Sequence, residues 1–218
     1  SELFEGSGHE LFFSALEGAH AAGRQLAIIL NSPLTDMAHV VSDGRWAARP
    51  TGVVCCVVAM GGAKEDADGR CVMEPSAQNN AFDLTAAQTV YGALQADADV
   101  PFIVTTRHVA SACQLPRSSL DGSMHPMALR LTSVAKPSLQ TLWVRSHRSE
   151  GERAAAKDSL PMRCDAAWFR ATFLEENAPE SLCAGDEVWP YVRGFNEYDG
   201  LATLVGAVYG QQELFGKF

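Results

Sequence analysis

The chain has 218 residues, of which 47% are hydrophobic and 20% are charged, and its formal net charge is −9. This length and composition suffice for one well-buried domain and exclude a disordered chain. Because no basic run offsets the negative charge, no apolar segment is long enough to cross a bilayer, and no signal peptide opens the chain, we expect no nucleic-acid partner, no membrane partner and a soluble, cytoplasmic protein.

The first half of the chain alternates helices with short apolar strands. A helix is expected where apolar residues recur every three or four positions, and a buried strand where β-branched residues run without interruption. The predicted elements are a helix at 9–22, a strand at 26–30, a helix at 34–41, a strand at 52–60, a polar loop at 75–83, a helix at 84–95 and a strand at 101–106. This order predicts an α/β fold with a doubly wound, mostly parallel sheet.

The second half of the chain is predicted to be helical. Between the predicted helices, residues 146–157 are charged and small, which favours a mobile surface loop, and residues 188–198 are irregular and aromatic-rich. No domain boundary is evident, so we expect a single domain over residues 1–218. The predicted helices lie at 109–115, 126–134, 138–145, 165–174 and 199–208.

The cysteines and histidines indicate neither a disulfide scaffold nor a zinc site. Six cysteines without a C-x-x-C pair are too few and too scattered for a disulfide framework, and Cys55 with Cys56 lies inside a predicted core strand. The six histidines show no H-x-x-x-H spacing. We therefore expect reduced, structural thiols, as in a cytoplasmic compartment.

Polar and glycine residues follow the predicted central strand. Gly61 and Gly62 come directly after it, at the edge where open α/β sheets place their ligands. They serve either a tight turn or a phosphate cradle, and neither G-x-x-x-x-G-K-[ST] nor G-x-G-x-x-G is present to favour the cradle. Asn79 and Asn80 are either ligand-binding or turn residues, and Asp83 is an expected N-cap of the helix at 84–95.

Four segments resemble motifs of the inosine/uridine-preferring nucleoside hydrolases, in the order of that family. The late Tyr198-Asp-Gly-Leu-Ala resembles H-D-P-L-A, and Val58-Ala-Met-Gly-Gly resembles V-x-M-G-G. Leu30-Asn-Ser-Pro-Leu-Thr-Asp-Met-Ala is similar to G-P-L-T-N-[LI]-A, and Asn79-Asn-Ala-Phe-Asp-Leu-Thr-Ala-Ala is similar to N-x-x-x-D-P-E-A-A. No D-x-D-x-x-x-D-D motif is present, so the chain looks like an amino-truncated or divergent member.

The resemblance implies hydrolysis of the N-glycosidic bond of a ribonucleoside to ribose and free base, assisted by bound Ca²⁺. It implies that Asp199 and the backbone carbonyl of Asn31 are calcium ligands. Asn79, with its neighbour Asn80, would bind the substrate ribose. Tyr198 stands where the family has a histidine that assists the leaving base, and a phenol can still donate a proton or stack on a purine.

Other positions depart from the family pattern. Ala77 and Cys71 fall where the family has a ribose-binding glutamate and an asparagine. Two functions therefore stay open: a ribonucleoside hydrolase that is incomplete in this chain, and a non-catalytic nucleoside- or sugar-binding pseudoenzyme. Both functions imply a small-molecule nucleoside as the partner. A homo-oligomer is possible with either function.

Several of these residues also have an ordinary structural interpretation. Asp199 is typical of a helix N-cap. Trp189, Tyr191 and Phe195 are either core residues or the rim of a base-stacking pocket. Cys164 has the residue type of a thiol nucleophile, but its helical context favours a structural cysteine.

Overall fold

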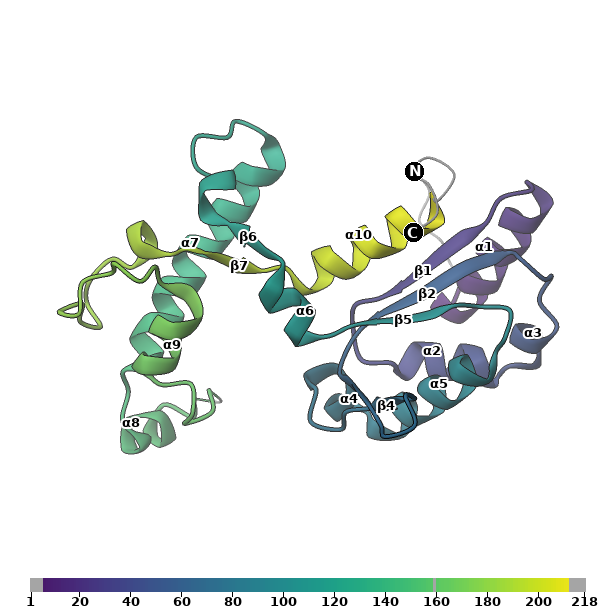
Figure 1. Ribbon diagram of the computed structural model, residues 1–218, viewed down its shortest axis with the longest axis horizontal. Coiled ribbons are helices and arrows are strands. Elements are labelled where there is room, and N and C mark those ends of the chain that lie inside the picture. Colours follow the sequence, from purple (N-terminus) through teal and green to yellow (C-terminus); the bar gives the residue numbers. More distant parts are fainter. Residues whose placement is uncertain (1–5, 159, 212–218) are drawn as a thin grey trace. The chain divides into compact units, whose positions relative to one another are not determined.

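The computed structural model describes residues 6–158 and 160–211 (Figure 1). The chain divides into two compact units: unit 1 consists of Ser1–Cys113 and Glu197–Phe218, and unit 2 of Gln114–Asn196. Each unit buries apolar side chains of its own. The expectation of a single domain over residues 1–218 stays a prediction.

Unit 1 is built on a parallel sheet whose described strands have the order β1-β2-β5. The strands are β1 (Leu26–Leu30), β2 (Val54–Met60) and β5 (Phe102–Thr105). In the register of the sheet, Val58 lies between Ile29 and Ile103. The α/β fold class and the parallel pairing of these three strands, both predicted from the sequence, are confirmed.

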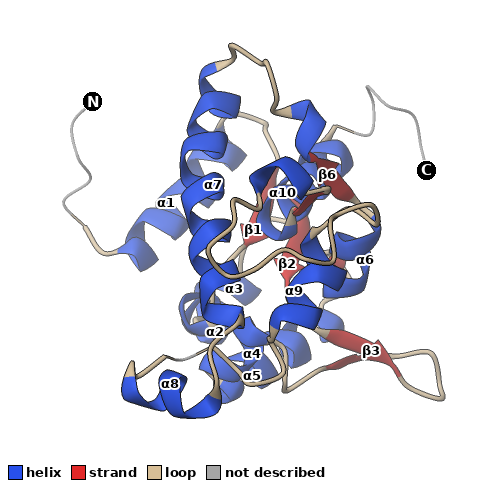
Figure 2. Ribbon diagram, turned by 90° about the vertical axis from the view of Figure 1, so that its left-hand side faces the viewer, coloured by secondary structure: helices blue, strands red, loops and turns tan. Residues whose placement is uncertain are grey.

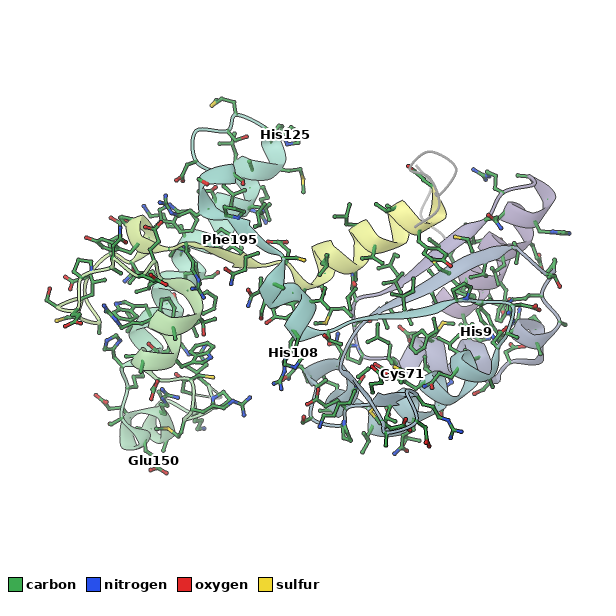
Figure 3. The ribbon with its side chains drawn as sticks, in the orientation of Figure 1. His9, Cys71, His108, His125, Glu150 and Phe195 are labelled. Atoms are coloured by element: carbon green, nitrogen blue, oxygen red, sulfur yellow. The ribbon has the colours of Figure 1, made fainter. Side chains whose placement is uncertain are left out.

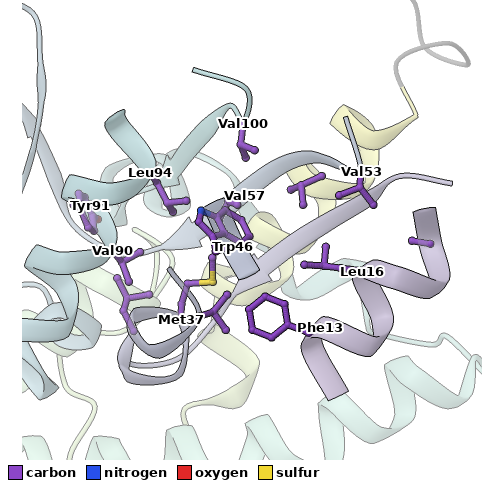
Figure 4. Close-up of a cluster of buried hydrophobic side chains, with 14 of the residues drawn as sticks. Phe13, Leu16, Met37, Trp46, Val53, Val57, Val90, Tyr91, Leu94 and Val100 are labelled. Carbon is purple, nitrogen blue, oxygen red and sulfur yellow. The ribbon is translucent and has the colours of Figure 1, made fainter. Parts of the chain in front are cut away.

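Helices cover both faces of this sheet (Figure 1). Because side chains alternate along a strand, Val57 packs into the cluster on one face (Figure 4), and Val58 packs into the cluster on the other. Both valines are fully buried, which explains the uninterrupted apolar run of β2. The first face carries α1 (Gly8–Ala21), α2 (Thr35–Ser42), α3 (Gly44–Ala47) and α5 (Leu84–Ala96), and the second carries α10 (Tyr198–Gly210).

A glycine allows α10 to lie close to the sheet. A Cβ atom added to Gly206 would stand 2.1 Å from Cδ1 of Ile29 and 3.6 Å from Cγ2 of Val58. A side chain at this position would therefore require the end of the Ile29 side chain to move aside. The close approach packs the carboxyl half of α10 against β1 and β2.

The segment that follows β2 is more regular than the sequence indicated. A hairpin of β3 (Ala63–Glu65) and β4 (Cys71–Met73) follows the sheet strand, and its β3 arm stands out in Figure 2. The predicted loop at 75–83 contains the short helix α4 (Gln78–Phe82). Strands of three residues are too short to show a hydrophobic period, which is why the hairpin was missed. Asp83 caps α5 as predicted, accepting a hydrogen bond from the Ala86 N–H at 3.0 Å.

The end of the predicted helix at 109–115 is wrong. Helix α6 (Arg107–Ala112) stops earlier, and β6 (Gln114–Pro116) begins unit 2. β6 pairs antiparallel with β7 (Gly194–Asn196), inside the segment that was predicted to be irregular. The same segment also contains the 3₁₀ helix Trp189–Tyr191.

The two helices predicted at 126–134 and 138–145 form one helix, α7 (Pro126–Ser146). Pro137 lies inside it on an exposed position, so the carbonyl that loses its helical partner can face water. Trp143 of α7 and Phe169 of α9 (Ala166–Phe173) are fully buried against each other, with ring centroids 5.1 Å apart. This aromatic contact belongs to the hydrophobic core of unit 2.

The mobile loop predicted at 146–157 is also wrong, because the structure places α8 (Glu150–Ala155) there. Ser149 and Glu152 form a capping box at its start. Arg153 is only 3% exposed, and its guanidinium donates hydrogen bonds to backbone carbonyls that include those of Ser146 and Cys164. The charged residues that suggested a mobile loop are thus a helix cap and a buried hydrogen-bonding centre.

The cysteines and the helices of the described residues were compared with a disulfide-linked and a membrane-spanning structure. The six cysteines are free thiols. Within residues 6–158 and 160–211, no helix is both long and apolar enough to cross a bilayer.

Candidate functional site

The carboxyl ends of the three parallel strands bring polar groups to one edge of the sheet in unit 1. Asn31 follows β1, Gly61 and Gly62 follow β2, and Thr105 ends β5. The Gly61 N–H donates to the Thr105 carbonyl at 3.2 Å, so the turn after β2 is tied to the neighbouring strand. In open α/β sheets this edge is where ligands bind.

Asn31 reaches the amino end of α10 at this edge. Its Nδ2 donates to the backbone carbonyl of Asp199 at 3.3 Å and lies 3.4 Å from Oγ1 of Thr203. The Thr203 hydroxyl donates to the same Asp199 carbonyl at 2.8 Å. The structure therefore brings together two predicted site residues that are 168 positions apart. The Oδ1 atom of Asn31 is buried and has no hydrogen-bond partner among the described residues, so one acceptor is left over.

Asp199 is exposed in the first turn of α10 and is not its N-cap. The N-cap is Glu197, whose side chain makes no capping hydrogen bond. The structural interpretation of Asp199 as an N-cap is therefore wrong. Tyr198, the first residue of α10, is 37% exposed.

The glycine pair after β2 is explained by packing. A Cβ atom on Gly62 would stand 2.3 Å from the Cβ of Ala77, which leaves no room for a side chain. The Gly62 carbonyl accepts hydrogen bonds from the Tyr91 hydroxyl at 3.1 Å, the Asn80 amide at 3.0 Å and the Glu74 N–H at 2.8 Å. Burial raises the pKa of the Tyr91 phenol to about 12, so it stays a neutral donor. Close packing therefore accounts for a glycine at position 62, and the choice between a tight turn and a phosphate cradle stays open.

Asn79 and Asn80 both use their amide groups to hold the protein together. Asn79 Nδ2 donates to the Met60 carbonyl, at the end of β2, at 3.0 Å. Asn80 is fully buried, and its Nδ2 also donates to the Glu74 carbonyl at 2.9 Å. Both therefore fix the loop at the carboxyl edge, and their predicted contact with a substrate ribose stays a prediction.

Sequence reasoning missed Glu74, which belongs to the same corner of unit 1. Its side chain is 12% exposed, and its carboxylate accepts a hydrogen bond from the Ser76 hydroxyl at 3.1 Å. The guanidinium of Arg107 lies 3.8 Å from it. Glu74 follows directly after β4, so only recognition of the β3–β4 hairpin could have placed it at this edge.

The predicted calcium site does not reach a full set of ligands with the described residues. Ca²⁺ takes about six to eight oxygens, commonly from several carboxylates. The edge offers the Asp199 carboxylate and the oxygens of Asn31, and no group of three or more His, Cys, Asp or Glu side chains within the described parts of the chain is placed to hold a metal ion. These residues alone do not fit a calcium ion.

Comparison with known proteins places the chain near two bacterial effectors. No family model and no curated protein matches it. The crystal structure of the Xanthomonas effector protein XOO4466 matches 92% of the chain with a TM-score of 0.65 and 25% identity. That of the Xanthomonas type III effector protein XopQ complexed with adenosine diphosphate ribose matches 92% with a TM-score of 0.62 and 27% identity. The chain spans 52% of each of these proteins.

These matches correct the assignment to the inosine/uridine-preferring nucleoside hydrolases. The four motif-like segments contain strand ends, tight turns and helix starts, such as the turn at Gly61 and the cap at Asp83. A parallel α/β sheet needs such residues at these places whatever its chemistry. The resemblance therefore follows the fold, and the proteins that this chain is similar to are type III effectors with an α/β fold.

Proposed function

We propose that unit 1 binds the ribose of a nucleoside-like ligand such as ADP-ribose at the carboxyl edge of its sheet. One observation carries the proposal: the Asn31 amide meets the backbone carbonyl of Asp199 there, the Asn31 side-chain oxygen has no hydrogen-bond partner among the described residues, and the Asp199 side chain is exposed. Ribose hydroxyls are donors that suit both oxygens. The complex of the structurally similar XopQ with ADP-ribose supports the choice of ligand.

In this proposal the residues of the edge have separate roles. Asp199 and Asn31 accept hydrogen bonds from the sugar, and Tyr198 offers a partly exposed ring on which a base can stack. Asn79 and Asn80 act indirectly, since their amides hold the loop between β2 and α4 in place. The net charge of −9 favours the nucleoside part over the phosphates as the main source of binding energy.

Hydrolysis of the N-glycosidic bond is the second candidate function. It would need a base to activate water and a group to protonate the leaving base. Tyr198 would supply the proton, and Asp199 with the Asn31 carbonyl would contribute to a calcium site that requires further oxygen ligands. Because no group of three or more His, Cys, Asp or Glu side chains among the described residues is placed to hold a metal ion, binding without cleavage is the function that we favour for this chain.

Isothermal titration calorimetry with ADP-ribose, adenosine, ribose 5-phosphate and adenine tests the proposal. If ribose is the recognised group, the first three bind and adenine does not. Asn31→Ala and Asp199→Ala should each weaken ADP-ribose binding at least about tenfold, corresponding to about 1.4 kcal/mol. Asp68→Ala removes the same charge from the exposed β3–β4 turn and should leave the affinity unchanged. Equal affinity of wild type and Asp199→Ala would refute this site.

A further inference from the structure

Arg107 lies at the carboxyl edge of the sheet in unit 1, and the proposed ribose site leaves its charge unused. It follows the end of β5 by two residues, and the register of the sheet places the ends of β1, β2 and β5 level to within one residue. Asn31, the first residue after β1, is therefore separated from the end of β5 by two strand spacings of about 4.8 Å each. A ligand that binds at Asn31 and extends across the glycine turn of β2 comes within reach of the Arg107 side chain.

The guanidinium of Arg107 has a partner but keeps its hydrogen-bond donors. Its side chain is 66% exposed and forms an ion pair with the Glu74 carboxylate, in which the nitrogen and the oxygen are 3.8 Å apart. This distance is too long for a hydrogen bond, and the guanidinium donates none to the residues that the structure describes. Its N–H groups are therefore available to a ligand.

Glu74 places this guanidinium beside the glycine turn. The Glu74 N–H donates to the Gly62 carbonyl at 2.8 Å, and the Glu74 carbonyl accepts a hydrogen bond from the buried Asn80 amide at 2.9 Å. Its carboxylate also lies against the turn, since a Cβ atom on Gly62 would stand 3.3 Å from Oε2 of Glu74. The ion pair therefore holds the charge of Arg107 close to the end of β2, between the ends of β1 and β5.

Two other arginines of unit 1 show that Arg107 differs from a structural arginine. Arg45 donates hydrogen bonds to two carboxylates, and Arg49 donates to the carboxylate of Asp97. Each of these two guanidinium groups also lies over an aromatic ring, 4.0 Å and 4.1 Å from its centroid. Within residues 6–158 and 160–211, Arg107 makes neither kind of contact.

We propose that Arg107 binds the phosphate groups carried by the 5′ oxygen of the ribose, so that unit 1 recognises a nucleoside diphosphate group rather than a nucleoside alone. This inference rests on the proposed function, because the ribose site at Asn31 sets the direction of the ligand. Phosphate oxygens accept charge-assisted, bidentate hydrogen bonds from a guanidinium, which are stronger than an exposed ion pair.

The charge of the chain makes a local cation necessary for such a ligand. A net charge of −9 repels phosphates in general, so their binding requires a positive group at the place where they lie. Arg107 is such a group, and its exposure lets the phosphates approach from solvent. The next residue, His108, labelled in Figure 3, is also exposed at the start of α6, so the backbone there lies at the surface.

Isothermal titration calorimetry with adenosine, ADP and ADP-ribose tests the inference, because ADP differs from adenosine only in its diphosphate. Arg107→Ala should weaken the binding of ADP and ADP-ribose at least about tenfold and change that of adenosine by less than about twofold. Higher salt should weaken ADP binding to the wild type more than to this variant. Arg24→Ala is the matched control. It removes the same charge from an exposed position two residues before β1, at the opposite edge of the parallel sheet, and should leave all three affinities unchanged.

Three results would overturn the inference, and they separate it from the ribose site. If ADP binds Arg107→Ala as tightly as the wild type while adenosine still binds, the ribose site stands and Arg107 does not contact phosphate. If Arg107→Ala loses adenosine and ADP to the same extent, the arginine supports the edge itself rather than the phosphates. If adenosine does not bind the wild-type chain, the ribose site is refuted, and the inference that rests on it is refuted as well.

Discussion

The two units use buried polar groups for different purposes. In unit 1 the side-chain oxygen of Asn31 is buried at the carboxyl edge of the sheet and has no hydrogen-bond partner among the described residues. In unit 2 the guanidinium of Arg153 is buried and donates hydrogen bonds to backbone carbonyls. The carboxyl edge of unit 1 thus keeps an unused hydrogen-bond acceptor among the described residues, whereas the buried arginine of unit 2 uses its donors to hold backbone segments together.

The largest effect is expected from removing the enclosed arginine of unit 2. Arg153→Ala leaves several buried carbonyls without a donor and should lower the free energy of unfolding of unit 2 by about 3 kcal/mol or more. Arg130→Ala, on the exposed face of α7, should change it by less than about 0.5 kcal/mol. Urea denaturation followed by tryptophan fluorescence measures both, with Trp46→Phe as background to remove the signal of unit 1. Equal stability of the two variants would show that Arg153 does not organise this unit.

A smaller effect is expected from crowding the edge of unit 1. Gly62→Ala places a methyl group against Ala77 and should destabilise unit 1 by about 1–3 kcal/mol while weakening ADP-ribose binding. Gly92→Ala is the matched control, because its Cβ meets nothing within 4 Å in the middle of α5, and it should stabilise by up to about 1 kcal/mol. Thermal unfolding and calorimetry on both variants measure these changes. If Gly62→Ala binds ADP-ribose as tightly as the wild type, the packing around Gly62 does not contribute to the binding site.

A still smaller, pH-dependent effect compares one carboxylate from each unit. Hydrogen bonds from Arg45 hold the pKa of Asp43 in unit 1 well below its usual range, and hydrogen bonds from Arg145 do the same to the pKa of Asp158 in unit 2. A lowered carboxyl pKa stabilises the fold above the unfolded value of about 4, and this stabilisation is lost as the pH falls further. Asp43→Asn and Asp158→Asn should therefore be less stable than wild type at pH 7, with the difference shrinking toward pH 2. If the stability difference between wild type and each variant stays constant from pH 7 to pH 2, the hydrogen bonds from the arginines do not lower the pKa values of these two aspartates.

How far the sequence predicts the structure also differs between the units. The three strands of unit 1 were predicted because long apolar runs such as β2 have few alternatives to a buried strand. Helix α8 was mistaken for a loop although Ser149 and Glu152 have the S-x-x-E spacing of a capping box, a local signal that was overlooked. Only the carbonyl partners of Arg153 cannot be seen in a local pattern. The order of the motifs in the sequence predicts that Asn31 and Asp199 lie together at the carboxyl edge. The position of Glu74 at this edge cannot be predicted without recognising the β3–β4 hairpin.

The smallest effect is expected for catalysis: with inosine or uridine and excess Ca²⁺, this chain should release no ribose above background in a reducing-sugar assay. Asp199 cannot be both a calcium ligand and the base that activates water, because a carboxylate bound to the metal is not free to take the proton. The oxygens of Asn31 are neutral and cannot replace it. Asp199→Ala should therefore leave the background rate unchanged while it weakens ADP-ribose binding, which would separate recognition of ribose from its cleavage. Turnover that disappears in Asp199→Ala would instead show that the edge of unit 1 already contains a complete hydrolytic site.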